Sequence, residues 1–453
     1  MLFPRSKHWF WLLIPIGIVI AITRYRTAIQ RKIDQAFRDI EASGYPSTLA
    51  ELNKSYAFVP PNENAALKFS QNFRAFRGSG NDRNLPVLGN GELPPLGEPF
   101  PKPMVTAIRK HLDANRRSLE AIDESMKLPR SRYPVDLSAG ASLMLPYLAE
   151  TKAAAQLLKL QAILAADQGD NKQAAHAILN QIAVANTLRD EPILISQLVR
   201  IAILRIAVST LEIALYRVDF EHGDFQKIAD QLQKADQDQA GSFKRSMAGE
   251  RCFGIDWFQT SSPAQQLQQL GQMGLSQPTG LSPVLAARRL VGLWDADKLY
   301  CLNFMKRAIA VADQPLPEAL DSSAALFSEL EKTRRRYYIA GLLLPALQNA
   351  FSKSVETSAA LRTARAGLAL RERIASGTAI TDDPQILTSS DLMKIEDPFT
   401  GKRLLTLGTN HSLLIYSVGR DRVDNHAKRL EKGYPLDQND IVFEIRAEPL
   451  PPR

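Results

Sequence analysis

Residues 9–22, WFWLLIPIGIVIAI, form an uninterrupted run without a charged side chain. Basic residues flank this run: Arg5 and Lys7 before it, and Arg24, Arg26, Arg31 and Lys32 after it. An apolar run between basic flanks is typical of a membrane-spanning helix, with aromatic and basic residues at the two interfaces. The run is shorter than the roughly 20 residues that cross a bilayer unaided, and local thinning of the bilayer can accommodate it. The sequence therefore predicts a membrane anchor within residues 1–27.

The side of the membrane on which the rest of the chain lies stays open at this point. No small-residue cleavage motif follows the run, which argues against a signal peptide that is removed. Lys and Arg are more numerous after the run than before it, which favours a cytosolic domain under the positive-inside rule. A basic tip followed by an apolar run and a long domain is, however, also how exported signal-anchored proteins begin.

Residues 142–240 carry the most regular helical pattern of the chain. Apolar residues recur there at helical spacing, and short turns separate the stretches. Two of these turns, QGD at residues 168–170 and HGD at residues 222–224, echo each other. Helix pairs that cannot bury an apolar face alone gain by stacking on a copy. We therefore expect a body of helical hairpins, which resemble tetratricopeptide-type repeats in their turns but differ from that family in their spacing.

Glycine and proline interrupt the helical pattern elsewhere. Residues 77–103 contain one or the other every few positions, which predicts a surface loop. Residues 331–377, in contrast, read as one long helix with a kink at Pro345.

The C-terminal hundred residues contain two short motifs in a fixed order. The first motif consists of Asp397, Pro398, Phe399 and Gly401, and the second of Tyr416, Ser417, Gly419 and Asp421, followed by Asp440 and Ile441. With the helix that precedes them, these motifs resemble the globular part of type II secretion major pseudopilins. The resemblance implies a helix packed on a small antiparallel sheet. The chain departs from that family because its matching helix is internal, whereas a pseudopilin carries its long apolar helix at the N-terminus.

The same resemblance implies a calcium site in the last loop, because that family commonly holds calcium there through Asp side chains and backbone carbonyls. The matching positions are Asp421 and Asp440, with Asp424 and Asp437 nearby as substitutes. Additional basic residues in this loop would weaken such a site by repulsion. In the alternative interpretation, Asp421, Asp424 and Asn425 only cap turns by hydrogen bonding to nearby backbone.

Known catalytic motifs are missing from the sequence. The six histidines form no zinc-binding pattern, and there is no nucleophile elbow, P-loop or dinucleotide-binding glycine motif. Two cysteines, Cys252 and Cys301, are too few for a disulfide framework. The net charge of +8 and the pI near 9.3 indicate a basic surface, but no aromatic-interleaved basic motif points to nucleic acid, and we expect no nucleic-acid partner. Whether the chain is an enzyme stays open.

These observations predict a mainly α protein, with a helical-hairpin body, an N-terminal transmembrane helix and a small C-terminal α+β module with a short antiparallel sheet. The expected divisions are residues 1–27, 28–141, 142–336 and 337–453. Stretches such as GYPSTLAELN and EPILISQLVRIAI resemble an uncharacterised class of single-pass bacterial proteins. That resemblance implies a place in the bacterial inner membrane, and of the two sides, which stay open, the periplasm is the one expected for the main domain.

The expected function is that of a membrane-anchored helical scaffold or protein-interaction protein of the cell envelope, with unidentified protein partners. Two alternatives remain. One is an accessory component of a secretion or pilus-like assembly, which the tail suggests. The other is a cell-envelope hydrolase with a site around SRYPVDLS and the Asp190 turn, for which a cleft lined by Arg132, Asp136 and Glu191 would be required.

Overall fold

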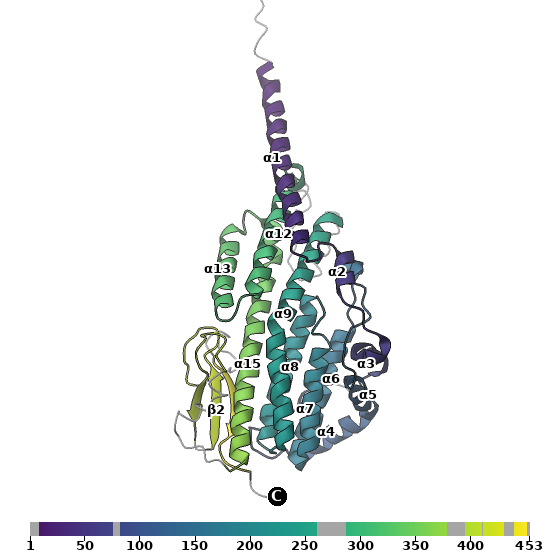
Figure 1. Cartoon of the computed structure of the whole chain (residues 1–453), viewed down its shortest axis with the longest axis vertical. Helices are drawn as coiled ribbons and strands as arrows, with labels where there is room; N and C mark the ends of the chain where they lie inside the picture. Colours follow the sequence, from purple (N-terminus) through teal and green to yellow (C-terminus); the bar gives the residue numbers. More distant parts are fainter. Residues whose placement is uncertain are drawn as a thin grey trace, which may run out of the picture.

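The computed structural model describes residues 9–75, 82–260, 287–377, 395–409, 411–429 and 439–450 of the chain. In these ranges the chain is mainly helical and ends in a small three-stranded antiparallel sheet, which confirms the predicted fold class in its coarse form. The longest helices of the body run along the long axis of the molecule, and the sheet lies beside α15 at the end opposite to α1 (Figure 1).

The helices of the N-terminal part are α1 (Trp9–Ala42), α2 (Leu49–Ser55), α3 (Ala65–Asn72), α4 (Lys102–Ala114) and α5 (Arg116–Met126). They are followed by α6 (Tyr147–Gln168), α7 (Asn171–Asn186), α8 (Leu194–Leu215), α9 (His222–Thr260), α12 (Leu293–Ala312) and α13 (Glu318–Thr333). The C-terminal part contains α14 (Tyr338–Leu343), α15 (Pro345–Ala375), β1 (Leu405–Gly408), β2 (Ser412–Ser417) and β3 (Ile441–Arg446). Two short 3-10 helices, Pro61–Glu63 and Leu137–Ser142, lie in the N-terminal loops.

The apolar run and the helix that follows it form one continuous helix, α1. The C-terminal half of α1 packs on α12 through Ile29, Ile33 and Ile40, which form an apolar cluster with Leu302. The N-terminal half stands clear of the body (Figure 1), and Ile14, Ile16, Ile18, Val19 and Ile20 are each more than half exposed.

The prediction of a transmembrane anchor is wrong. No helix in the described ranges is both long enough and apolar enough to span a bilayer. The physical reason is the length of the uncharged run, because its 14 residues from Trp9 to Ile22 rise only about 21 Å at 1.5 Å per residue, against a hydrocarbon core of about 30 Å. The next turns of α1 carry Arg24 and Arg26. The assignment to the bacterial inner membrane as a single-pass protein with a periplasmic domain is corrected together with the anchor.

The body of the molecule is built from α6 to α9 with α15 packed alongside. The predicted turn after residue 168 is confirmed, because α6 ends at Gly169 in the left-handed conformation (φ 82°). Asp170 then caps α7 by accepting a hydrogen bond from the N–H of Gln173 at 2.9 Å. The left-handed conformation favours glycine, and an Asp side chain satisfies a free N–H at the start of a helix. The sequence Gly-Asp therefore reverses the chain between two helices.

The C-terminal sheet has the strand order β1-β2-β3, with both pairs antiparallel. Leu414 pairs with Leu407 on one side and with Glu444 on the other. One face of the sheet packs on α15, where Phe443 approaches so closely that a Cβ atom added to Gly367 would lie 2.4 Å from its ring. Glycine at this position thus allows the helix and the sheet to meet.

Buried charges join the sheet to the helical body. Arg371 of α15 is fully buried and donates to both carboxylate oxygens of Asp219 at 2.6 and 2.9 Å. Its remaining nitrogen donates to the carbonyls of Arg446 and Glu448 at 2.9 and 2.6 Å. Tyr216, the residue that follows α8, donates to Glu444 of β3 at 2.5 Å. The body and the sheet are therefore connected by charge-assisted hydrogen bonds as well as by apolar contacts.

The predicted single helix over residues 331–377 is interrupted in two places. α13 ends at Thr333 and α14 begins only at Tyr338. The turn between them brings Gly341 so close to Arg334 that a Cβ atom at Gly341 would lie 2.8 Å from the Arg334 Cβ. The second interruption, at Leu344, is the predicted one before Pro345. The division of the chain into four domains stays a prediction, although one apolar cluster contains residues as far apart as Leu49 and Ile445.

Candidate functional site

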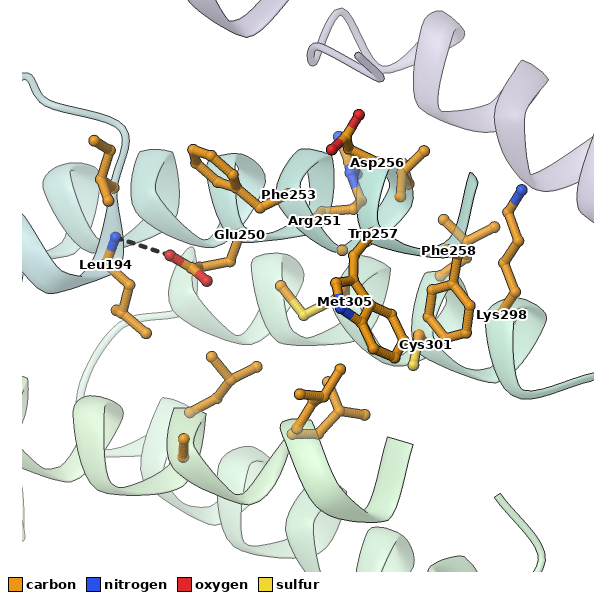
Figure 2. A pocket seen from close by; sticks show the side chains of 18 of the residues that line it. Leu194, Glu250, Arg251, Phe253, Asp256, Trp257, Phe258, Lys298, Cys301 and Met305 are labelled. Atoms are coloured by element: carbon orange, nitrogen blue, oxygen red, sulfur yellow. Dashed lines mark hydrogen bonds between the residues drawn. The ribbon is translucent and has the colours of Figure 1, made fainter. Parts of the chain in front are cut away.

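A cavity of about 510 Å³ lies between α9, α12 and the junction of α14 with α15 (Figure 2). Most of its wall is apolar. The apolar wall includes Leu143, Ile193, Leu194, Phe253, Trp257, Phe258, Met305, Leu343, Leu344 and Leu347. Small-molecule sites in proteins are typically concave, mainly apolar and of this volume, with few polar groups. This cavity is therefore our candidate binding site.

One wall of the cavity comes from the residues on either side of Pro345. Pro345 is the first residue of α15, and because proline has no N–H, the hydrogen-bond ladder between α14 and α15 is broken at Leu344. Leu343 and Leu344, just before this break, line the cavity together with Leu347 from the first turn of α15.

Aromatic side chains form one end of the cavity. Trp257 and Phe258 of α9 line it, and both contact Trp294 of α12, with ring centroids 5.7 and 5.2 Å apart. Rings in edge-to-face and offset contacts stabilise each other beyond their buried area. This end of the wall is therefore a rigid surface that is formed before any ligand binds.

Two carboxyl groups line the cavity, those of Glu250 and Asp256, and that of Glu250 lies beside the apolar residue Leu194. It comes from α9 and accepts a hydrogen bond from the backbone N–H of Leu194 at 3.1 Å (Figure 2). Burial raises the pKa of Glu250, and the N–H of Leu194 opposes this effect. Burial disfavours the charged form of a carboxyl group. Glu250 thus remains a neutral acid at higher pH than an exposed glutamate does.

The other ionisable groups of the wall also respond to burial. Burial raises the pKa of the Cys301 thiol far above its ordinary value, so the reactive thiolate is disfavoured. Burial lowers the pKa of Arg251 and that of Lys298. The arrangement therefore offers a mainly apolar surface with a hydrogen-bonding carboxyl group at Glu250, a combination suited to binding.

The predicted calcium residues lie in a loop that hydrogen bonds to itself. Asp421 accepts from the N–H of Val423 at 3.1 Å and from the side chain of Asn425 at 3.1 Å. Asp440 accepts from the N–H groups of Asn425 and Lys428 at 3.4 and 3.2 Å. In the described residues no cluster of three or more His, Cys, Asp or Glu side chains could hold a metal. These hydrogen bonds match the turn-capping alternative, and the calcium site stays a prediction.

The sequence analysis also named Asp424 and Asp437 as substitute calcium ligands in this loop. Asp424 accepts from the hydroxyl of Tyr416 and the N–H of His426 at 3.0 and 2.9 Å, and Asp437 lies outside the described residues.

The structure brings the two C-terminal motifs together. Asp397 of the first motif accepts from the hydroxyl of Ser417 at 2.8 Å and from the N–H of Val418 at 3.1 Å, both in the second motif. It also accepts from the N–H of Phe399 at 2.9 Å. Asp397 is buried, so these bonds satisfy a carboxylate that would otherwise be costly to bury. The motifs therefore have a structural role as a buried turn.

The three residues required for a hydrolase cleft serve separate contacts. Arg132 donates to the carbonyl of Tyr56 at 3.1 Å and lies over its ring. Asp136 caps a turn by accepting from the N–H of Ser138 at 3.0 Å. Glu191 is fully buried and accepts a hydrogen bond from the hydroxyl of Tyr147. None of the three lines the cavity of Figure 2, and the hydrolase hypothesis receives no support from their arrangement.

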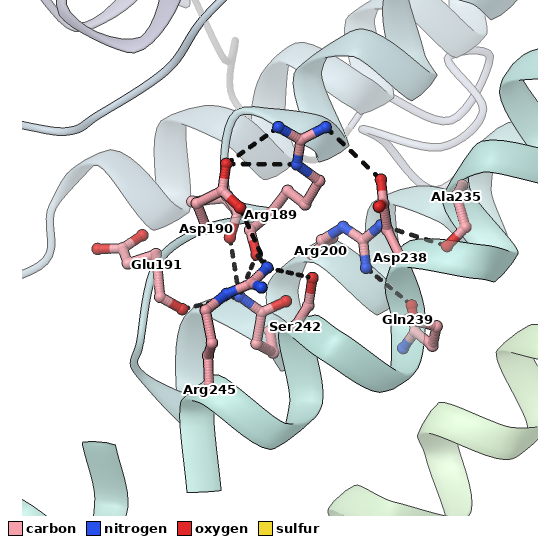
Figure 3. A network of polar contacts seen from close by, with 11 residues as sticks. Arg189, Asp190, Glu191, Arg200, Ala235, Asp238, Gln239, Ser242 and Arg245 are labelled. Atoms are coloured by element: carbon pink, nitrogen blue, oxygen red, sulfur yellow. Dashed lines mark hydrogen bonds and ion pairs between the residues drawn. The ribbon is translucent and has the colours of Figure 1, made fainter. Parts of the chain in front are cut away.

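The Asp190 turn belongs to a network of charges between α8 and α9 (Figure 3). Asp190 pairs with Arg189 at 3.0 Å and with Arg245 at 3.1 Å, and Arg189 also reaches Asp238 at 3.6 Å. Beneath them, Arg200 is fully buried and donates to Gln239 at 2.8 Å. Burial lowers the pKa of Arg200 to about 10. The network holds the connection between α7 and α8 against α9, and this is a structural role.

Comparison of the chain with protein-family models, with curated proteins and with solved structures gives no match. The resemblance of the tail to pseudopilins accordingly stays a prediction, and the function must be argued from the structure.

The sequence alone did not point to the cavity. Its walls come from segments more than 190 residues apart, Leu143 to Leu347, and each segment alone is an ordinary amphipathic helix. One local signal was present, since Pro345 within the sequence LLLPAL predicts a helix break with leucines on both sides.

Proposed function

We propose that this protein is a helical binding protein that holds an apolar ligand in the cavity between α9, α12 and the α14–α15 junction. The observation that carries the proposal is the cavity itself, about 510 Å³ with a mainly apolar wall. Transfer of apolar surface from water to such a wall contributes about 25 cal/mol per Å². Rigid aromatic and leucine side chains supply that surface without the cost of ordering a loop.

Titration with diphenylhexatriene, an apolar fluorophore that brightens when it leaves water, tests this proposal. We expect saturable binding to the full-length protein. The variant Leu344→Trp places a larger side chain at the wall and should weaken binding by at least about tenfold, which corresponds to about 1.4 kcal/mol. Val423→Trp, at an exposed position of the C-terminal loop, is the matched control and should bind as the wild type does. Equal affinity in Leu344→Trp and the wild type would contradict the proposal.

A second candidate function, protein interaction, is supported by the exposed part of α1. Ile14, Ile16, Ile18, Val19 and Ile20 are exposed, and at 100° per residue they surround the helix on all sides. A helix that is apolar all round needs several neighbours to cover it. We therefore propose self-association of several copies of the chain through this segment.

Light scattering of the full-length protein tests the second candidate. The measured mass should exceed that of the 50.3 kDa monomer, and the double variant Ile14→Glu/Ile18→Glu should return it to the monomer. A wild-type protein that is already monomeric would exclude self-association.

A further inference from the structure

The charged groups around the cavity differ in the direction in which they point. Glu250 lies beside Leu194, whereas the ends of Asp256 and Lys298 point to the opposite side in Figure 2. Lys298 lies 5.2 Å from the ring centroid of Phe37. Arg251 donates to the carbonyl of Pro46 at 3.1 Å. Each of these cations is therefore engaged with the segment of the chain that contains α1 and the loop after it.

The other parts of the cavity wall place no charged group beside Glu250. From the junction of α14 and α15 come only apolar side chains, Leu343, Leu344, Ala346 and Leu347. Besides Lys298, α12 brings one titratable group to the lining, the Cys301 thiol, whose pKa is raised by burial. Asp256 lies next to Gly140, where a Cβ atom would be 3.0 Å from its carboxylate. Glu250 is therefore a carboxyl group in an apolar environment with one backbone partner, the N–H of Leu194.

The hydrogen-bonding capacity of Glu250 is only partly used. One oxygen, Oε1, accepts from Leu194. A protonated carboxyl group also has an O–H donor, and Glu250 lines the cavity. A donor at the wall of an apolar cavity selects a ligand that brings an acceptor to it, because an unmatched polar group is costly there.

We infer that the ligand is a neutral apolar molecule with a carbonyl oxygen, such as a ketone or an acyl ester, and that protonated Glu250 donates a hydrogen bond to that oxygen. This inference rests on the proposed function, since it names the class of ligand for the same cavity. A charged ligand fits less well. An amine would require an ion pair in apolar surroundings, where the cost of desolvating two charges can exceed their attraction.

A pair of ligands of equal size tests the inference. Methyl octyl ketone and undecane have the same number of heavy atoms, and each is used to displace diphenylhexatriene from the full-length protein. The measured quantity is the ratio of the two affinities, which removes the hydrophobic contribution that the ligands share. We expect Glu250→Met to lower the preference for the ketone by about tenfold relative to the wild type, as the loss of one hydrogen bond of about 1 to 1.5 kcal/mol implies.

The variant Glu250→Gln is the control for loss of the fold. Its amide accepts from Leu194 and still donates to a carbonyl, so it should keep the preference for the ketone. In the wild type the preference should fall as the pH rises and Glu250 loses its proton, whereas in Glu250→Gln it should not change with pH. Glu120→Gln, at an exposed position of α5, is the control and should retain the pH dependence of the wild type.

Three outcomes overturn the inference. An unchanged ratio in Glu250→Met would show that the carboxyl group does not select the ligand, and the proposed function would stand if both ligands still displaced the probe. Tighter binding of decylamine than of the ketone would show that Glu250 acts as an anion. Failure of both uncharged ligands to bind would refute the proposed function itself.

Discussion

Burial raises the pKa of both Glu191 and Glu250 in the helical body, but Glu191 is fully buried whereas Glu250 is partly exposed and lines the cavity. Glu191 accepts from the hydroxyl of Tyr147, whose ring stacks on Tyr133 with centroids 4.0 Å apart. The hydroxyl of Tyr133 shares a hydrogen bond of 2.9 Å with that of Thr187. Burial raises the pKa of Glu191 to about 7, against the opposing effects of Tyr147 and Arg132.

The raised pKa of Glu191 predicts a pH-dependent stability. Between the unfolded value of 4.5 and the folded value of about 7, the folded state binds the proton more tightly than the unfolded state does. The free energy of unfolding should therefore fall as the pH rises through this window, by on the order of 3 kcal/mol, and level off above it.

Urea unfolding across pH 4 to 8 measures the contribution of Glu191 as the difference between the wild type and Glu191→Gln. In Glu191→Gln the free energy of unfolding should no longer show the part of its pH dependence that Glu191 causes. Glu41→Gln, at an exposed position of α1, should show the same pH dependence as the wild type. The same pH dependence of the free energy of unfolding in Glu191→Gln and the wild type would show that the pKa of this carboxyl group is not raised by folding.

At the scale of elements, the contact between α15 and the sheet depends on the absence of a side chain at Gly367. A Cβ atom there would lie 2.4 Å from the Phe443 ring, and overpacking of this kind costs about 1–3 kcal/mol. We expect Gly367→Ala to lower the free energy of unfolding although alanine favours the helix. Gly241→Ala, at an exposed position inside α9 where the nearest atom is 3.7 Å away, should raise it by up to about 1 kcal/mol. Chemical denaturation measures the free energy of unfolding of the two variants. A higher value in both variants than in the wild type would contradict the close contact between Gly367 and Phe443.

Arg371 connects the same helix to both the body and the end of β3. Its replacement in Arg371→Met leaves Asp219 and two carbonyl groups without their donor, and loss of one partner of a buried charge pair typically costs about 3–5 kcal/mol. Hydrogen exchange should show faster exchange in β3. Lys353→Met, at an exposed position of α15, should leave the exchange of β3 unchanged, and slow exchange of β3 in Arg371→Met would refute this role.

The sequence predicted those elements whose signals are local. The Gly169–Asp170 turn and the break before Pro345 each follow from a few neighbouring residues. The C-terminal sheet was expected from the resemblance of the two motifs to pseudopilins, and the structure contains it. The break between Thr333 and Tyr338 was missed because no glycine or proline marks it in residues 334–337. The transmembrane prediction failed because it gave the flanking basic residues more weight than the short length of the uncharged run.

At the scale of the whole molecule, the cavity exists only because distant segments pack together. Leu194, Glu250, Met305 and Leu344 come from four helices or helix ends, and nothing in the sequence around any of them specifies the other three. The candidate site was therefore beyond prediction from the sequence. The residues predicted from motifs, Asp421 and Asp440, accept hydrogen bonds within their own loop, and a calcium site there stays a prediction.

The central claim is that the cavity is where the protein binds apolar ligands, and the position of a photoreactive ligand tests it most directly. The full-length protein is irradiated with an alkyl diazirine, and the labelled peptides are identified by mass spectrometry. The account predicts labels concentrated in residues 250–258, 298–305 and 343–347, and competition by excess undecane should remove them. Labels that instead gather on residues 14–20 of α1, or that excess undecane does not reduce, would contradict it.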